Sequence, residues 1–132
     1  MNMDVNYSVT IEDFAERHYI KSFQKKYKGA WDITMCAIIA EFERIDMLLN
    51  TEKADPITNT GGIKIIKTDF RVTGTKESAK ASGNRCIILV DEKLKTVSVL
   101  LVYAKTDLPS ANETSEWKKL VKNNYPDLKK YI

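Results

Sequence analysis

Residues 80–90 read Lys-Ala-Ser-Gly-Asn-Arg-Cys-Ile-Ile-Leu-Val, a polar turn that leads directly into a continuous apolar run. Such a run predicts a strand that is covered on both faces or central in its sheet. Gly83 allows a positive φ angle and a close approach of the backbone to a ligand. The strand would hold the guanidinium of Arg85 in one place, near the ammonium of Lys80. This arrangement suits a phosphate; the plainer alternative is a surface turn with two solvated cations.

The positive charge of the chain is concentrated beside this predicted strand. The 132 residues include 21 Lys and Arg and 18 Asp and Glu, which gives a formal net charge of +3. Residues 71–85 contain four cations and Glu77 alone, so 4 − 1 also gives +3 and the rest of the chain is neutral. The four cations are Arg71, Lys76, Lys80 and Arg85. Clustered cations add their potentials within about 8–10 Å, which indicates an anionic partner: RNA, DNA or an acidic protein segment.

The first part of the chain predicts one strand and two helices. β-forming residues alternate over residues 5–11, and apolar residues recur every three or four positions over 12–28 and over 31–49. Gly29 is expected to end the first helix, so that the two helices form a hairpin. Residues 50–62 are rich in turn-forming residues and are expected to form a loop.

The second part of the chain changes to the period of strands. Three runs are expected to be strands, at residues 63–72, 85–90 and 96–104. Ser110 and Glu113 have the spacing of a capping box that opens a third helix, and Pro126 ends it. We therefore predict one α+β domain spanning residues 1–132, with a helical hairpin and a C-terminal helix packed on a small antiparallel sheet.

Apolar spacing also predicts the interior. One core between helices and sheet is expected to contain Trp31, Ile38, Phe42, Ile45, Ile88, Val99, Leu101 and Trp117. Cys36 and Cys86 lie in apolar stretches without C-x-x-C spacing and are expected to be buried thiols rather than metal ligands. No run approaches the roughly 18 apolar residues of a membrane span, and the first residues lack the pattern of a signal peptide. A cytoplasmic protein without metal or cofactor is expected.

A wider pattern surrounds the basic turn. A predicted helical hairpin precedes a turn of the form Lys-x-Ser-Gly-x-Arg, which is followed by an apolar strand, an acidic reversal and a last strand that closes in Tyr-x-Lys. The matching residues are Lys80, Ser82, Gly83, Arg85, Asp91, Glu92, Tyr103 and Lys105. In this order of elements, residues 14–107 resemble the RelE/HigB-type toxins of the RelE/ParE toxin–antitoxin superfamily.

The resemblance implies a ribonuclease that cuts messenger RNA, often on the ribosome, and that an antitoxin encoded next to it holds inactive. The protein would be a monomer or part of a toxin–antitoxin hetero-oligomer. Cleavage without a metal ion requires stabilisation of the phosphorane charge and a proton transfer at each end.

Cationic side chains would stabilise that phosphorane. Arg85 is expected to bind the scissile phosphate, Lys105 to supply a second charge from the adjacent strand, and Lys80 to assist them. The residues expected to bind RNA around them are Arg71, Lys76, Lys80 and Ser82. Lys25, Lys26 and Lys28 are either a solvated helix end or an extension of the same RNA track.

The groups that would transfer protons are less clearly marked. Many members of the family place a tyrosine or histidine shortly after the last strand, whereas this chain has Thr-Asp-Leu-Pro at residues 106–109. The candidates are Asp107, Glu113 and Tyr125. Two alternatives therefore stand beside the nuclease. One is a binding protein on the same fold, either a ParE-like gyrase inhibitor or a catalytically lost domain that binds RNA or protein, and the other is a non-toxic accessory factor of a phage or plasmid.

Overall fold

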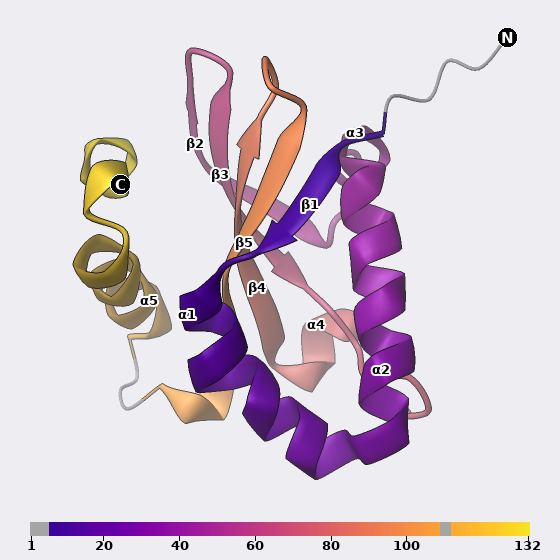
Figure 1. Cartoon of the computed structure of the whole chain (residues 1–132). Helices are drawn as coiled ribbons and strands as arrows, with labels where there is room; N and C mark the ends of the chain where they lie inside the picture. Colours follow the sequence, from indigo (N-terminus) through magenta and orange to yellow (C-terminus); the bar gives the residue numbers. More distant parts are fainter. Residues whose placement is uncertain (1–5, 109–111) are drawn as a thin grey trace, which may run out of the picture.

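The computed structural model describes residues 6–108 and 112–132 and has helices on both faces of one sheet (Figure 1). The strand order is β1-β5-β4-β3-β2. The bounds are β1 Ser8–Ile11, β2 Ala54–Thr60, β3 Ile63–Asp69, β4 Asn84–Asp91 and β5 Thr96–Ala104. The predicted α+β class is confirmed, and the three long apolar runs are strands as expected.

The pairing of the strands is antiparallel except at one edge. β2, β3, β4 and β5 form consecutive antiparallel pairs, whereas β1 runs parallel to β5. Parallel pairing requires a long crossover, and the N-terminal helices lie in that connection. β4 and β5 are central and almost fully buried, which explains why their sequences are continuously apolar.

The N-terminal helices form two arms that meet at an elbow (Figure 1). They comprise α1 Asp13–Ala15, the π-helical turn η1 Glu16–Ile20, α2 Lys21–Glu43 and the short α3 Ile45–Leu48. Lys28 interrupts α2 with φ 37° and ψ −118°. The predicted hairpin is therefore present, but the break falls on Lys28 instead of at Gly29, whose φ is not positive. The elbow exposes Lys25, Lys26 and Lys28.

The prediction of a loop over residues 50–62 is wrong, because Ala54–Thr60 forms the strand β2. Pro56 lies within β2 at the edge of the sheet, where a missing backbone N–H removes no hydrogen bond to a further strand. The register shifts between Pro56 and Thr58, which absorbs the proline as a bulge. Because edge strands tolerate turn-forming residues, the composition of this segment concealed a strand, and four strands rather than three follow the helical arms.

The sheet separates two cores, so the expectation of a single core is wrong, although all eight predicted residues are buried. The face under the helical arms buries Trp31, Ile38, Phe42, Ile45, Ile88 and Val99. The other face buries Leu101 and Trp117, together with Tyr103 and Val121. Cys86 is buried as predicted, but Cys36 is exposed on the outer side of α2. Successive residues of a strand point to opposite faces, so a continuous apolar strand feeds both cores.

The C-terminal helix α5 Glu113–Asn124 covers the second face, and the 3-10 turn η3 Pro126–Tyr131 follows it. Asn112 is the N-cap, because its side-chain oxygen accepts a hydrogen bond from Ser115 N at 3.2 Å. Glu113 is therefore the first residue of the helix and not the third residue of a capping box. The other half of that predicted box, Ser110, lies outside the described residues. No helix in the described ranges is long and apolar enough to cross a membrane.

Candidate functional site

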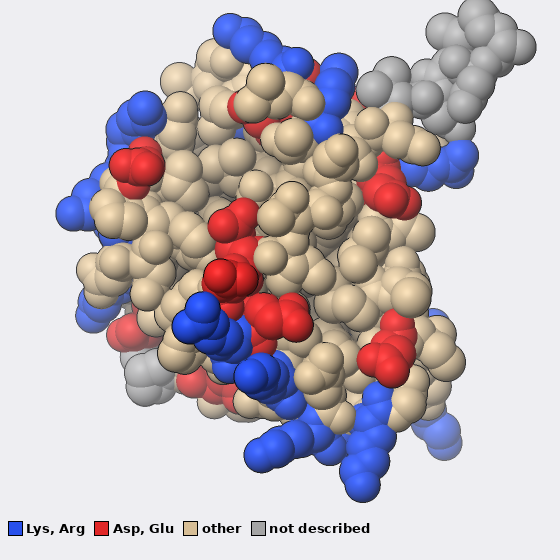
Figure 2. Space-filling view, viewed as in Figure 1, with Lys and Arg blue, Asp and Glu red and all other residues tan. Residues whose placement is uncertain are grey.

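The predicted site residues other than Tyr125 lie at or near one end of the sheet, where β3 ends, β4 begins and β5 ends. The register places Arg85 beside Asp69 on one side and beside Tyr103 on the other. The exposed cations at or next to this end are Arg71, Lys76, Lys80 and Lys105. We call this region the basic end. Lys and Arg side chains also gather in the lower part of Figure 2, over the first helical arm and the elbow.

A short helix and a glycine shape the turn at the basic end. α4 Ala79–Ser82 is capped by Ser78, whose hydroxyl oxygen accepts a hydrogen bond from Ala81 N at 3.1 Å. Gly83 follows with φ 77°, the left-handed conformation expected for this glycine. Its carbonyl oxygen accepts a hydrogen bond from Lys105 N at 2.7 Å. This bond fixes Lys105 directly beside the turn that carries Lys80.

The hydroxyl of Ser82 is engaged within the protein. It lies 2.7 Å from the carbonyl oxygens of both Phe70 and Ala79 and accepts a hydrogen bond from Asn84 N at 3.0 Å. These contacts tie the end of β3 to the start of β4. In this arrangement Ser82 shapes the turn, and the RNA contact expected of its side chain would have to replace one of these bonds.

Arg85 is held in an ion-pair network beneath the N-terminus of α5. Its Nε atom lies 3.1 Å from Asp69 Oδ1 and 3.7 Å from Glu113 Oε2, and Nη1 donates to Asn84 O at 3.3 Å. The contact with Asp69 is an ion pair without the alignment of a hydrogen bond. Only 12% of the Arg85 side chain is exposed. Two carboxylates therefore neutralise the arginine that the sequence presents as the main phosphate ligand.

Glu113 is also bound to a tyrosine. The Tyr103 hydroxyl donates a hydrogen bond to Glu113 Oε2 at 2.6 Å. Burial, and then this bond, raise the pKa of Tyr103 well above its usual range, so the phenol keeps its proton at neutral pH. Glu113 lies beside Arg85, the position expected of a proton-transfer group. Its carboxylate, however, already accepts the hydrogen bond from Tyr103 and forms an ion pair with Arg85.

The other two proton-transfer candidates are separated. Asp107 lies at the basic end in the 3-10 turn η2 Lys105–Asp107, where its Oδ2 accepts a hydrogen bond from Ala104 N at 3.0 Å. Its side chain is exposed. Tyr125 instead donates to Leu100 O at 2.8 Å, several residues back along β5, and burial raises its pKa. The structure therefore brings Asp107 together with the cations and leaves Tyr125 outside the group.

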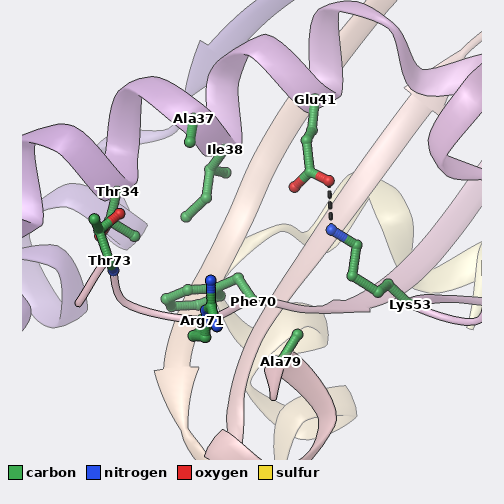
Figure 3. A pocket seen from close by; sticks show the side chains of 9 residues that line it. All are labelled: Thr34, Ala37, Ile38, Glu41, Lys53, Phe70, Arg71, Thr73 and Ala79. Atoms are coloured by element: carbon green, nitrogen blue, oxygen red, sulfur yellow. Dashed lines mark hydrogen bonds and ion pairs between the residues drawn. The ribbon is translucent and has the colours of Figure 1, made fainter. Parts of the chain in front are cut away.

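Arg71 lines a separate pocket between α2 and the segment that follows β3 (Figure 3). The pocket has a volume of about 410 Å³ and is crossed at one side by an ion pair between Lys53 and Glu41. Thr34 closes its other side through a hydrogen bond from Thr73 N to the Thr34 hydroxyl at 2.8 Å. Arg71 thus belongs to a pocket that neither Lys80 nor Lys105 lines. No cluster of three His, Cys, Asp or Glu residues suited to a metal ion occurs within the described ranges.

Sequence reasoning missed Asn84 as part of this end and left open whether the lysines of the elbow of α2 belong to it. Ser22, Lys26 and Tyr27 line a small pocket together with Asn84 and Asp107. Lys26 of the elbow therefore adjoins the turn after β5. Asn84 carried no signal beyond a polar residue at the start of an apolar strand, and its neighbours on α2 become apparent only in the fold.

Comparison with known proteins identifies the fold. No protein-family model matches the sequence, and no curated protein sequence matches it. The structure is similar to that in the crystal structure of the archaeal RelE–RelB complex from Pyrococcus horikoshii OT3, with a TM-score of 0.53 and 16% sequence identity. The similarity covers 76% of this chain and 96% of that chain. The protein has a RelE-like α+β fold.

Proposed function

We propose that the protein is the toxin of a type II toxin–antitoxin pair and acts as one domain, a metal-independent endoribonuclease that cleaves messenger RNA on or off the ribosome. The observation that carries this proposal is the basic end: a RelE-like fold exposes Lys80 and Lys105 on either side of the Gly83 turn. Fold alone does not define activity, so the proposal depends on these side chains.

The geometry supports distinct roles for the two lysines. The backbone of Lys105 is fixed by its bond to Gly83, while its exposed side chain can meet a phosphate from solvent. Lys80 projects from the neighbouring short helix. Two cations placed in advance around one phosphate stabilise the additional negative charge that develops in the phosphorane. Lys76 and Arg71 would bind the flanking phosphates, and the exposed carboxylate of Asp107 is the available group for proton transfer.

Arg85 can bind the phosphate only when its ion pair with Glu113 is broken. A phosphate would compete with the two carboxylates for the guanidinium, and the ion pair with Glu113 is the longer of the two, 3.7 Å against 3.1 Å for Asp69. We infer that RNA replaces Glu113 beside Arg85. Arg85 would then hold the phosphate that Lys105 approaches from the adjacent strand.

The substitution Glu113→Gln tests whether an RNA phosphate replaces the Glu113 carboxylate beside Arg85. Glutamine keeps the shape and still accepts a hydrogen bond from Tyr103, but it removes the charge that competes for Arg85. Two charges about 4 Å apart interact by ~1 kcal/mol even in water, so RNA affinity is expected to rise roughly fivefold. Glu116→Gln, in the same helical turn, makes the same change in net charge and serves as the control. An equal rise in both variants, measured by fluorescence anisotropy with labelled RNA, would show that only net charge matters.

The neutralised state of Arg85 also favours a second candidate function, a toxin or domain that binds its target without cleaving RNA. Such a protein, like a ParE-type gyrase inhibitor, needs no free arginine and no general base. In that case the protein would arrest growth while cellular RNA stays intact. Growth arrest with new RNA ends distinguishes the nuclease from this alternative.

An antitoxin partner follows from the same proposal, because the similar archaeal structure is a complex of RelE with RelB. A partner that covers the basic end would supply carboxylates and an amphipathic segment. Expression of the protein alone is expected to arrest growth. Expression together with the gene next to its own should restore growth and give a complex that purifies as one species; unrestricted growth in both cases would reject the toxin proposal.

A further inference from the structure

The outer face of α2 and α3 carries apolar side chains that no other part of the described chain covers. Figure 1 shows this helical arm at the outside of the molecule. Three large apolar side chains are mostly exposed within residues 6–108 and 112–132, and two of them lie on this face: Ile33 is 59% exposed and Met47 is 60% exposed. Single exposed apolar residues are normal, but two of them on one helical face indicate a contact surface.

A groove lies at the Met47 end of this face. Its volume is about 470 Å³, and the residues that line it include Ala37, Ala40, Arg44, Met47 and Thr51. Arg44 is the non-helical residue between α2 and α3, and the groove takes side chains from both helices, so the face continues across the joint. The small side chains of the two alanines allow a second helix to approach to about 8 Å between axes.

The spacing along this face is symmetric about Ala40. Ile33 precedes Ala40 by seven residues, and Met47 follows it by seven residues. Ile33 is therefore a projecting side chain on the same face as a groove that its own chain leaves unfilled. When two copies meet antiparallel about Ala40, Ile33 of each copy lies opposite Met47 of the other and enters the other groove. Such a face is complementary to itself, which is the requirement for an isologous dimer.

The charges along the face favour the antiparallel direction. The end that carries Ile33 adjoins the basic elbow, whereas the end that carries the groove is acidic. The exposed cations of the first end are Lys25, Lys26 and Lys28, and the exposed carboxylates of the second end are Glu43, Asp46 and Glu52. Asp32 beside Ile33 and Arg44 in the groove are the reverse pair of signs. An antiparallel pair brings opposite charges together, whereas a parallel pair would bring like charges together.

We propose that two copies of this chain form a two-fold symmetric dimer through the outer face of α2 and α3, with the helices antiparallel and centred on Ala40. The inference goes beyond the proposed function and does not depend on it, because neither Lys80 nor Lys105 lines the groove. A single pair of helices forms an interface near the lower limit of about 1,000 Å² for specific complexes. The Kd of the dimer is therefore expected to be micromolar rather than nanomolar.

Sedimentation equilibrium of the purified protein tests the dimer. The wild type is expected to change from monomer to dimer between about 1 and 200 µM. Ala40→Arg keeps a helix-forming residue at an exposed position and places two guanidinium groups at the two-fold axis, so it should stay folded and lower the affinity at least about 100-fold. Leu94→Arg is the matched control, because it adds the same charge and removes the third exposed apolar side chain, between β4 and β5. This variant should dimerise like the wild type.

Disulfide cross-linking tests the antiparallel register. In a Cys36→Ser background the one remaining cysteine is Cys86, which is buried. Oxidation should link the Ala40→Cys protein to itself, because position 40 faces its own copy across the axis. The Ile33→Cys protein should link to the Met47→Cys protein in a mixture of the two, and far less to itself.

A wild type that stays monomeric up to about 200 µM, or a dimer that Ala40→Arg leaves intact, would overturn the proposal. Preferential linking of Ile33→Cys to itself would indicate a parallel pair and would contradict the antiparallel arrangement. If the wild type is monomeric and Ala40→Arg blocks only the complex with the protein encoded next to its own, the face belongs to that partner and the dimer is rejected. A protein that dimerises as expected but cleaves no RNA would keep the dimer and reject the nuclease.

Discussion

Lys105→Ala is expected to lower the rate of RNA cleavage about 100- to 1000-fold, or roughly 3–4 kcal/mol, with a much smaller loss of RNA affinity. The reason is that the phosphorane carries more charge than the ground-state phosphate, so a cation placed beside it acts mainly on the rate. Lys105 is the cleaner choice over Arg85. Its side chain is exposed, whereas Arg85→Ala would also leave Asp69 and Glu113 without their shared cation. Arg85→Ala should lower both cleavage and stability.

The measurement is single-turnover cleavage of a labelled RNA by purified protein, with affinity determined separately. Lys25→Ala is the matched control, because it removes the same charge from the elbow of α2. This variant should weaken binding and flatten its salt dependence while the rate of the bound complex stays unchanged. A folded Lys105→Ala protein with wild-type cleavage would remove Lys105 from the reaction and make the binding protein the better account.

Trp117→Ala is expected to lower the free energy of unfolding by about 3–5 kcal/mol. Trp117 is fully buried on the α5 face of the sheet, where it packs in the second core with Leu101 and Tyr103. Its removal leaves a cavity and loosens the helix whose first residue holds Arg85. Urea unfolding followed by circular dichroism measures the change.

Trp117→Phe is the control for this substitution. Phenylalanine retains most of the apolar volume and removes an indole N–H that has no hydrogen-bond partner in the described structure. Its effect should therefore be much smaller than that of Trp117→Ala. A loss below about 1 kcal/mol in Trp117→Ala would mean that α5 contributes little to the stability of the fold, and the account of two cores would be wrong.

The sequence predicted those parts of the fold in which local pattern and burial agree. The runs that became β4 and β5 are apolar on both faces because the helical arms cover one side and α5 the other. Helical spacing likewise placed Trp31 and Phe42 in the interior. In contrast, β2 is an edge strand with one neighbour, so its residues need neither alternate nor be apolar, and Pro56 suggested a turn.

The sequence predicted only those parts of the candidate site whose residues are close to one another along the chain. Lys80, Gly83 and Arg85 are close in sequence, and the glycine has the left-handed conformation that its position suggested. The ion-pair partners of Arg85 are Asp69 in β3 and Glu113 in α5. No local sequence pattern predicts an ion pair between residues so far apart in the chain. Glu113 matched a capping box by spacing alone, whereas in the fold its carboxylate binds Tyr103. The pocket at Asn84 depends on the elbow of α2 in the same way.

In the proposed function, exposed lysines at the end of a RelE-like sheet stabilise the phosphorane during RNA cleavage. Induced expression of the wild type and of Lys105→Ala, followed by genome-wide mapping of RNA 5′ ends, tests this role of Lys105 in the cell. The wild type is expected to arrest growth and to produce new 5′ ends within messenger RNAs, while a folded Lys105→Ala protein at equal abundance should produce few or none. Growth arrest by the wild type without new RNA ends, or the same ends with Lys105→Ala, would contradict it.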